Sequence, residues 1–201
     1  MGALMTPAST TSLKHVLILG ALLCFNKTLK TERSLSTLLK VAMVLRANPQ
    51  SREVLEESIK LCKEAIEIQV QDAESWAGLG TSYLKMFFDF SHNPSDLFRS
   101  LKAYNMATNY LDLDQNLSYS TDSSSDIFRN RGLIQYYMEE YDSAVQDFNV
   151  AIKDVKYKEI CGLEIKNISA YVKSVSDSLL QLVILLLLKE IERDAKGKRF
   201  N

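Results

Sequence analysis

Proline and glycine are scarce in this sequence of 201 residues, which has only three prolines and seven glycines. Both residue types interrupt helices, so their scarcity excludes long flexible linkers and favours helices joined by short turns. The formal net charge is −1 and the pI is near 6.2. A chain without an excess of basic residues lacks the electrostatic footprint of a nucleic-acid-binding protein, so no direct DNA binding is expected.

Residues that form disulfides or bind metals are few and scattered. The three cysteines (Cys24, Cys62 and Cys161) form no CxxC pair, and the only histidines are His15 and His92. This spacing matches neither a disulfide framework nor a zinc site, and it is typical of a protein from a reducing compartment.

Long hydrophobic runs are also missing, since the two apolar runs are shorter than the ~20 residues of a membrane span. The run at residues 15–25 has the length of a signal-peptide core, but it lacks a small-x-small cleavage site and its helical pattern continues beyond it. The run Leu182–Leu188 is apolar at seven consecutive positions and therefore on every side of a helix. A cap buries only one side, so we expect part of this run to be exposed and to mediate self-association.

An internal repeat is present in the last third of the chain. The tetratricopeptide pattern is a helix–turn–helix of about 34 residues in which defined positions are large, small or aromatic. Positions 4, 8, 17, 20, 24 and 27 are filled without a gap by Phe128, Gly132, Tyr141, Ala144, Phe148 and Ala151. The usual closing proline is missing, and Lys156 lies near its place.

The stretch SWAGLGTSYLKM, at residues 75–86, fits the same pattern. With Trp76 at position 4, Gly80 is at position 8 and Tyr104 at position 24, after an insertion of eight residues. Glycine disfavours a helix by ~1 kcal/mol relative to alanine, so Gly80 needs a reason to be there. A cofactor loop is excluded because no further glycine completes a GxGxxG motif. We therefore predict that a neighbouring helix crosses at Gly80.

These patterns predict an all-α fold, a solenoid of antiparallel tetratricopeptide helix pairs with a C-terminal capping helix. Residues 1–157 would form the array, with a partial N-terminal repeat, an extended repeat at 73–111 and a complete repeat at 125–157; residues 158–201 would form the cap and tail. The helices expected span residues 12–29, 34–46, 53–69, 73–88, 95–111, 126–139, 141–153 and 157–195. The serine-rich segment 112–125 is expected to be a loop.

No arrangement of residues in the sequence suggests catalysis, a cofactor or a metal, so an enzyme is not expected. The first helix of each pair should instead line a concave binding groove. Asp126 is at position 2 of a first helix, where its carboxylate could cap the helix or contact a ligand. The pattern alone leaves both interpretations open.

Several segments together resemble the tetratricopeptide repeat protein 5 (stress-responsive activator) family. They are CFNKTL with SLSTLLKVAMVLR, then KLCKEAIEIQVQDAESWAGLGTSYLKMFF, NPSDLFRSLKAYNMA and DIFRNRGLIQYYMEEYDSAVQDFNVAI, covering residues 24–159. They occur in the family's order, and the insertion of eight residues has the same place and length. The resemblance implies a non-enzymatic adaptor that recognises the Met-Arg-Glu amino terminus of nascent tubulin at the ribosome and promotes tubulin mRNA decay.

The resemblance also implies three peptide-binding residues. Arg46 matches a groove arginine that suits the peptide's glutamate, and Asp126 matches a groove aspartate that suits its arginine. Glu159 matches a groove glutamate near the peptide's amino end, after one gap. The family resemblance implies activity in the cytoplasm and nucleus, with ribosomal and mRNA-decay partners. The alternative is a scaffold for nuclear transcriptional coactivators in the stress response.

The family's basic segment after the repeats and its oligonucleotide-binding-fold domain have no counterpart here. Where the basic segment is expected, the chain has SLLQLVILLLLKEIERDAKGKRFN. We therefore expect a truncated or divergent member in which peptide recognition is retained and ribosome docking is in question.

Overall fold

The computed structural model describes residues 27, 33–47, 49–113 and 121–197, and the secondary structure of these residues is helical. The elements are α2 (Leu35–Ala47), α3 (Arg52–Ile68), α4 (Ala73–Met86), the π-helical turn η1 (Phe87–Ser91), α5 (Pro94–Leu113), α6 (Thr121–Tyr137), α7 (Tyr141–Ala151) and α8 (Lys158–Gly197). The predicted helix at 12–29 and the apolar run at 15–25 lie outside the described residues, apart from Lys27.

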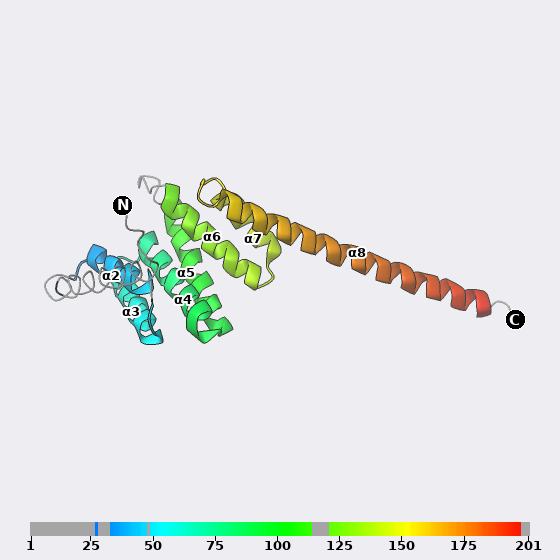
Figure 1. The fold of residues 1–201 in the computed structure, drawn as a ribbon, viewed down its shortest axis with the longest axis horizontal. Coiled ribbons are helices and arrows are strands. Elements are labelled where there is room, and N and C mark those ends of the chain that lie inside the picture. The colour runs from blue at the N-terminus through cyan, green and yellow to red at the C-terminus, as the bar shows by residue number, and fades with distance from the viewer. Residues whose placement is uncertain (1–26, 28–32, 48, 114–120, 198–201) are drawn as a thin grey trace, which may run out of the picture.

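The helices stack as antiparallel pairs along one direction (Figure 1). Helix α2 packs on α3, α4 on α5 and α6 on α7, and the second helix of each pair packs on the helix that follows it. Each pair buries its apolar faces against its neighbours, as expected for a solenoid. The predicted fold class is confirmed.

Three apolar clusters follow one another along the stack. The first joins α2, α3 and α4, the second joins α4, α5 and α6, and the third joins α6, α7 and α8. Tyr104 and Phe148, which share position 24 of the repeat, are each 1% exposed in the second and third clusters. The helices of the stack therefore carry apolar residues at helical spacing, and these residues are buried against the helix before and the helix after.

The repeat glycines lie where two helices cross, as the spacing predicts. A Cβ atom added to Gly80 of α4 would lie 3.0 Å from the ring of Tyr104 on α5. A Cβ atom on Gly132 of α6 would lie 2.9 Å from the ring of Phe148 on α7. In both pairs, the aromatic side chain occupies the space that a larger residue would need.

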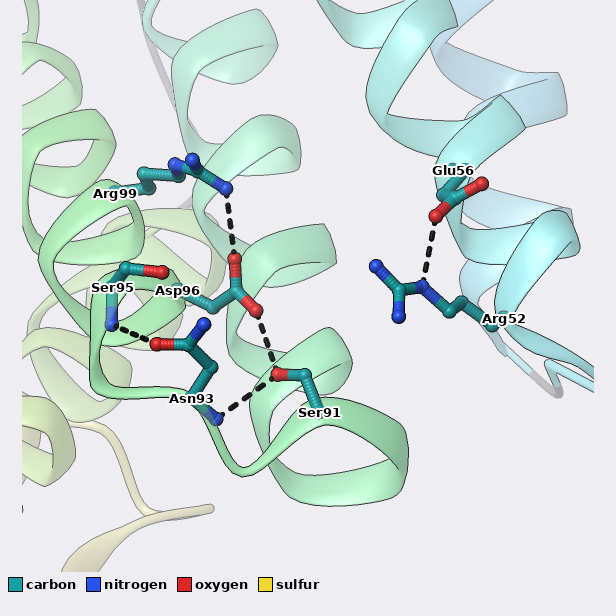
Figure 2. Close-up of polar contacts among 7 residues, drawn as sticks. All are labelled: Arg52, Glu56, Ser91, Asn93, Ser95, Asp96 and Arg99. Atoms are coloured by element: carbon teal, nitrogen blue, oxygen red, sulfur yellow. Dashed lines mark hydrogen bonds and ion pairs between the residues drawn. The ribbon is translucent and has the colours of Figure 1, made fainter.

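The eight-residue insertion lengthens α4 and α5 at the end where they are joined. Helix α4 continues into η1, which ends at His92 in a left-handed conformation with φ of 47°. The connection is held by polar contacts (Figure 2): Ser91 Oγ donates to Asp96 Oδ2 at 2.6 Å, and the Ser95 amide donates to Asn93 Oδ1 at 3.0 Å. The buried positions Ser100, Tyr104 and Ala107 therefore keep their repeat register.

Two predicted boundaries need correction. Helix α6 begins at Thr121, five residues before the predicted start at Asp126, and α5 extends to Leu113. Residues 112–113 and 121–125 of the predicted loop at 112–125 are therefore helical, and residues 114–120 lie outside the described part of the chain. Threonine, aspartate and serine are common in loops, but they are also favoured at the start of a helix, which is why the composition was misleading.

Helix α8 caps the solenoid with its first turns and then projects away from it (Figure 1). Cys161 and Ile168 are buried against α7, whereas every side chain described from Ser169 to Lys189 is exposed. The run Leu182–Leu188 is 48–58% exposed, in agreement with the expected exposure. By length and composition alone, one helix in the described ranges could cross a membrane, at Lys158–Lys189, where a window of 18 residues has mean hydropathy 1.6.

Candidate peptide-binding site

Arg46 lies in the last turn of α2, and its guanidinium extends over α4. Its Nη1 atom would be 3.4 Å from a Cβ atom on Gly78, and it lies 4.0 Å from Cys62 Sγ on α3. The sequence alone did not explain Gly78, the first glycine of the GLG stretch. The structure shows that its missing side chain leaves room for the guanidinium.

Arg46 has no carboxylate partner in the ion pairs among the described residues. Its positive charge lowers the pKa of the Cys62 thiol, against the larger effect of burial, which raises that pKa. Because the guanidinium is half-buried and lacks an anion, it can accept one from a ligand.

The buried phenol of Tyr104 is close enough to Arg46 and to a second arginine, Arg129, for both charges to affect its pKa. Tyr104 Oη on α5 is 2.9 Å from Thr81 Oγ1 on α4. Burial raises the pKa of Tyr104 to about 12, and the hydrogen bonds with Thr81 and Asn130 and the charges of Arg46 and Arg129 oppose this rise. We call the residues Arg46, Thr81, Tyr104, Arg129 and Asn130 the polar row; they come from α2, α4, α5 and α6.

Arg129 is the second arginine of the polar row. Its Nη1 atom donates to Asn130 Oδ1 at 3.0 Å, and no ion pair of the described residues includes it. Its charge also lowers the pKa of the Cys161 thiol on α8, which burial raises. The polar row thus provides two guanidinium groups that form no ion pair within the described part of the chain, a combination suited to binding carboxylates.

Asp126 is already paired within the protein. Its Oδ1 atom accepts a hydrogen bond from Lys156 Nζ at 3.0 Å and another from Tyr157 Oη. Because α6 begins at Thr121, Asp126 lies in the second turn of the helix, so its interpretation as a capping residue is wrong. The carboxylate instead joins α6 to the turn between α7 and α8.

The two donors to Asp126 were missed by the sequence analysis. The pKa of Lys156 is raised by its hydrogen bonds with Tyr157 and Asp126, and burial together with the Asp126 bond raises the pKa of Tyr157. The sequence did give one clue: Lys156 lies near the position where the repeat usually has its closing proline. Its backbone amide donates to Asp154 Oδ1 at 2.9 Å, so a turn centred on an aspartate replaces the proline.

Glu159 lies in the first turn of α8, with an exposed side chain. A carboxylate there is favourable to the helix dipole whether or not a ligand is bound. Glu159 is two residues after Tyr157, whose hydroxyl donates a hydrogen bond to Asp126. Glu159 and Asp126 therefore lie at the same end of the solenoid. Arg46 lies two helix pairs away, and the polar row extends from it to α6.

Replacing Gly78 with alanine is expected to weaken peptide binding without destabilising the fold. The added Cβ atom would lie 3.3 Å from Cys62 Sγ, which must shift by a few tenths of an ångström, and 3.4 Å from Arg46 Nη1, where it restricts the guanidinium. Alanine is favoured in a helix by up to ~1 kcal/mol, which offsets the small shift of Cys62. Urea denaturation should give an unchanged or higher midpoint, and peptide titration should show a lower affinity. A destabilised variant would mean that the buried Cys62 side chain cannot shift.

The fold and the repeat register define a tetratricopeptide-type protein-binding domain, a class of scaffold that is generally not catalytic. No family model matches the chain. Over 134 residues, 64% of the chain, it is 30% identical to tetratricopeptide repeat protein 5 of Homo sapiens and 29% identical to that of Mus musculus. The match covers 29% of each of these relatives, so the chain spans less than a third of their length.

The solved structure of MamA, a tetratricopeptide repeat protein, has a similar fold. The TM-score is 0.54, with 18% sequence identity over 84% of this chain and 91% of that one. The resemblance in fold therefore extends beyond the segment shared with tetratricopeptide repeat protein 5, to which this domain is distantly related.

Proposed function

We propose that this chain is a non-enzymatic adaptor that binds the nascent amino-terminal peptide of tubulin and promotes tubulin mRNA decay. The observation that carries the proposal is the arrangement of charges: Arg46 and Arg129 lack protein carboxylates among the described residues, while Asp126 lies on α6 one turn before Arg129. The side chains of the peptide Met-Arg-Glu carry one charge of each sign to match. The site of action is the cytoplasm, at the ribosome.

In this proposal, Arg46 binds the peptide's glutamate and Asp126 binds its arginine. The arginine must displace Lys156, but both members of the Asp126–Lys156 pair are about half exposed, at 46% and 60%. Exposed ion pairs stabilise a protein by only ~0–1 kcal/mol. A guanidinium can make two parallel hydrogen bonds with the carboxylate, whereas a lysine ammonium acts as a point charge. Displacement of Lys156 is therefore favourable.

Glu159 is assigned to the peptide's amino group in the same proposal. Its side chain is exposed at the start of α8, two residues after Tyr157, which is a donor to Asp126. A positively charged amino group would add a charge-assisted hydrogen bond at this end of the site.

Fluorescence titration of a labelled peptide that begins with Met-Arg-Glu tests the proposal. Arg46→Glu and Asp126→Lys should each weaken binding about 10- to 100-fold, because a hydrogen bond to a charged group contributes ~1.5–3 kcal/mol. Lys156→Ala should strengthen binding by up to about fivefold, because it removes the competitor. The exposed Asp142 in the first turn of α7 provides the control, and Asp142→Lys should leave the affinity unchanged.

A peptide of reversed charge makes the test specific. Asp126→Lys should bind Met-Glu-Glu better than Met-Arg-Glu, a preference that a merely misfolded variant would not show. The proposal is wrong if the unmodified chain does not distinguish Met-Arg-Glu from a scrambled peptide, or if Asp126→Lys and Asp142→Lys weaken binding equally.

A further inference from the structure

The apolar residues of α8 follow a regular spacing that extends well beyond the run Leu182–Leu188. Alternating steps of four and three residues connect Cys161, Ile165, Ile168, Val172, Val175, Leu179, Leu182 and Leu186. We call these eight residues the α8 stripe. Steps of four and three place the residues at the a and d positions of a heptad, which is the pattern of a helix that packs along a second helix.

The base of the α8 stripe is already packed against a helix. Cys161 is 1% exposed and Ile168 is 4% exposed, in the apolar cluster that includes Phe148 and Ala151 of α7. Helix α7 has only 11 residues and begins at Tyr141, whose ring lies 5.5 Å from that of Tyr171, so it covers only the first turns of α8. The face that binds a helix at the base therefore continues along α8 without a partner within the described part of the chain.

The same register becomes exposed beyond Ile168. Val172 is 48% exposed, Leu179 is 57% exposed and Leu186 is 55% exposed, in contrast to the nearly complete burial at the base. Twelve large apolar side chains between Tyr171 and Leu188 are 40–60% exposed. At roughly 80 Å² each, they amount to an area on the order of 1,000 Å² around the whole circumference of the helix, of which the five residues of the α8 stripe supply about 400 Å², half of the ~800 Å² that each partner buries in a stable complex. An ordinary surface patch on a monomer is only a few hundred Å².

The residues beside the stripe favour an identical partner. In the middle of the helix, the flanking heptad positions e and g are Ser169, Tyr171, Ser176 and Ser178. None of these side chains is charged at neutral pH, so two copies of α8 can approach without repulsion between like charges. The nearby charged residues, Lys173 and Asp177, occupy positions b and f, away from the stripe.

We propose that two copies of this chain associate through the α8 stripe from Val172 to Leu186, as a helical coiled coil outside the solenoid. A lipid bilayer fits the observations less well. The continuous apolar run, Leu182–Leu188, is seven residues long and spans about 10 Å, a third of the ~30 Å hydrocarbon thickness. The preceding turns contain Lys173, Asp177 and three serines at 174–178, which suit an aqueous coiled coil.

Two matched double variants test the proposal with the full chain. Leu179→Asp with Leu186→Asp changes the stripe, whereas Leu180→Asp with Leu187→Asp changes two leucines outside it. Both pairs are seven residues apart, and their exposures are similar, at 57% and 55% against 60% and 58%. Size-exclusion chromatography with light scattering, at micromolar concentration without detergent, gives the mass of each protein relative to the 22.8 kDa chain.

The unmodified chain and the Leu180/Leu187 variant should have twice the chain mass, and the Leu179/Leu186 variant should have the mass of a single chain. Thermal melts followed by circular dichroism should show the solenoid transition in all three, because these leucines lie outside the solenoid. A monomeric unmodified chain, or equal loss of association in both variants, would overturn the proposal. Co-flotation of a monomeric chain with phosphatidylcholine vesicles, abolished equally by both variants, would identify lipid as the partner. Neither the mass measurement nor the vesicle assay depends on peptide binding.

Discussion

Replacing Arg131 with alanine is expected to lower the free energy of unfolding by about 3–5 kcal/mol, because it leaves a buried carboxylate unpaired. The guanidinium of Arg131 forms two parallel hydrogen bonds with Asp147 of α7, at 2.6 and 2.7 Å. Asp147 is only 4% exposed. Arg131 also donates to Thr108 Oγ1 of α5 at 2.8 Å, so this one side chain connects three helices. Urea denaturation measures the loss.

An exposed ion pair provides the control for Arg131. Arg52 and Glu56 lie one turn apart on α3, with side chains 62% and 54% exposed (Figure 2). Arg52→Ala should change the free energy of unfolding by no more than ~0.5 kcal/mol. In the double variant Arg131→Ala with Asp147→Ala, stability should partly return because no unpaired charge remains. Equal costs for Arg52→Ala and Arg131→Ala would show that Asp147 is solvated.

Gly132→Val is expected to be more damaging than Gly80→Val, and both should destabilise the protein. Overpacking a core costs ~1–3 kcal/mol. At Gly80, the obstructing atoms belong to the Tyr104 ring, but at Gly132 the backbone oxygen of Ala144 also lies 3.2 Å from the added Cβ atom. A backbone atom yields less readily than a side chain, so the Gly132 variant should have the lower midpoint in thermal or urea denaturation.

A glycine away from the helix crossings should behave in the opposite way. A Cβ atom on Gly162 of α8 would lie 3.6 Å from Ile152 Cδ1, an ordinary contact. Gly162→Ala should therefore raise stability, by up to ~1 kcal/mol from helix propensity.

The Gly80 prediction has a clear contrary outcome. If Gly80→Val raised the denaturation midpoint, the close approach of α4 and α5 at Gly80 would be wrong.

The fold was predictable because its packing repeats along the sequence. Large, small and aromatic residues recur at fixed intervals, so Gly132 with Phe148 identifies one helix crossing and Gly80 with Tyr104 identifies a second. The insertion of eight residues did not hide the second crossing, since it extends both helices at their junction and leaves the crossing unchanged.

The candidate site was less predictable because its contacts join residues far apart in the chain. Asp126 pairs with Lys156 and Tyr157, which are 30 and 31 positions away. No pattern of adjacent residues predicts such a pair, and the wrong start of α6 made helix capping a plausible alternative for Asp126. The space over Gly78 that holds Arg46 was likewise invisible, because it depends on how α2 is placed against α4. The peptide-binding roles of Arg46, Asp126 and Glu159 remain predictions.

The lysine at the place of the closing proline gives Asp126 and Arg46 different expected responses to ionic strength in the proposed site. Dissolved salt screens exposed charges over a Debye length of ~8 Å at physiological concentration. At Asp126, salt weakens the interaction with a cationic group of the ligand and also the competing interaction with Lys156. The two effects on the affinity for the ligand therefore oppose each other. At Arg46, no carboxylate among the described residues competes with the ligand, so salt only weakens the interaction between Arg46 and an anionic group of the ligand. If Arg46 and Asp126 bind a ligand as proposed, rising salt should therefore shift the selectivity of the site from anionic toward cationic side chains.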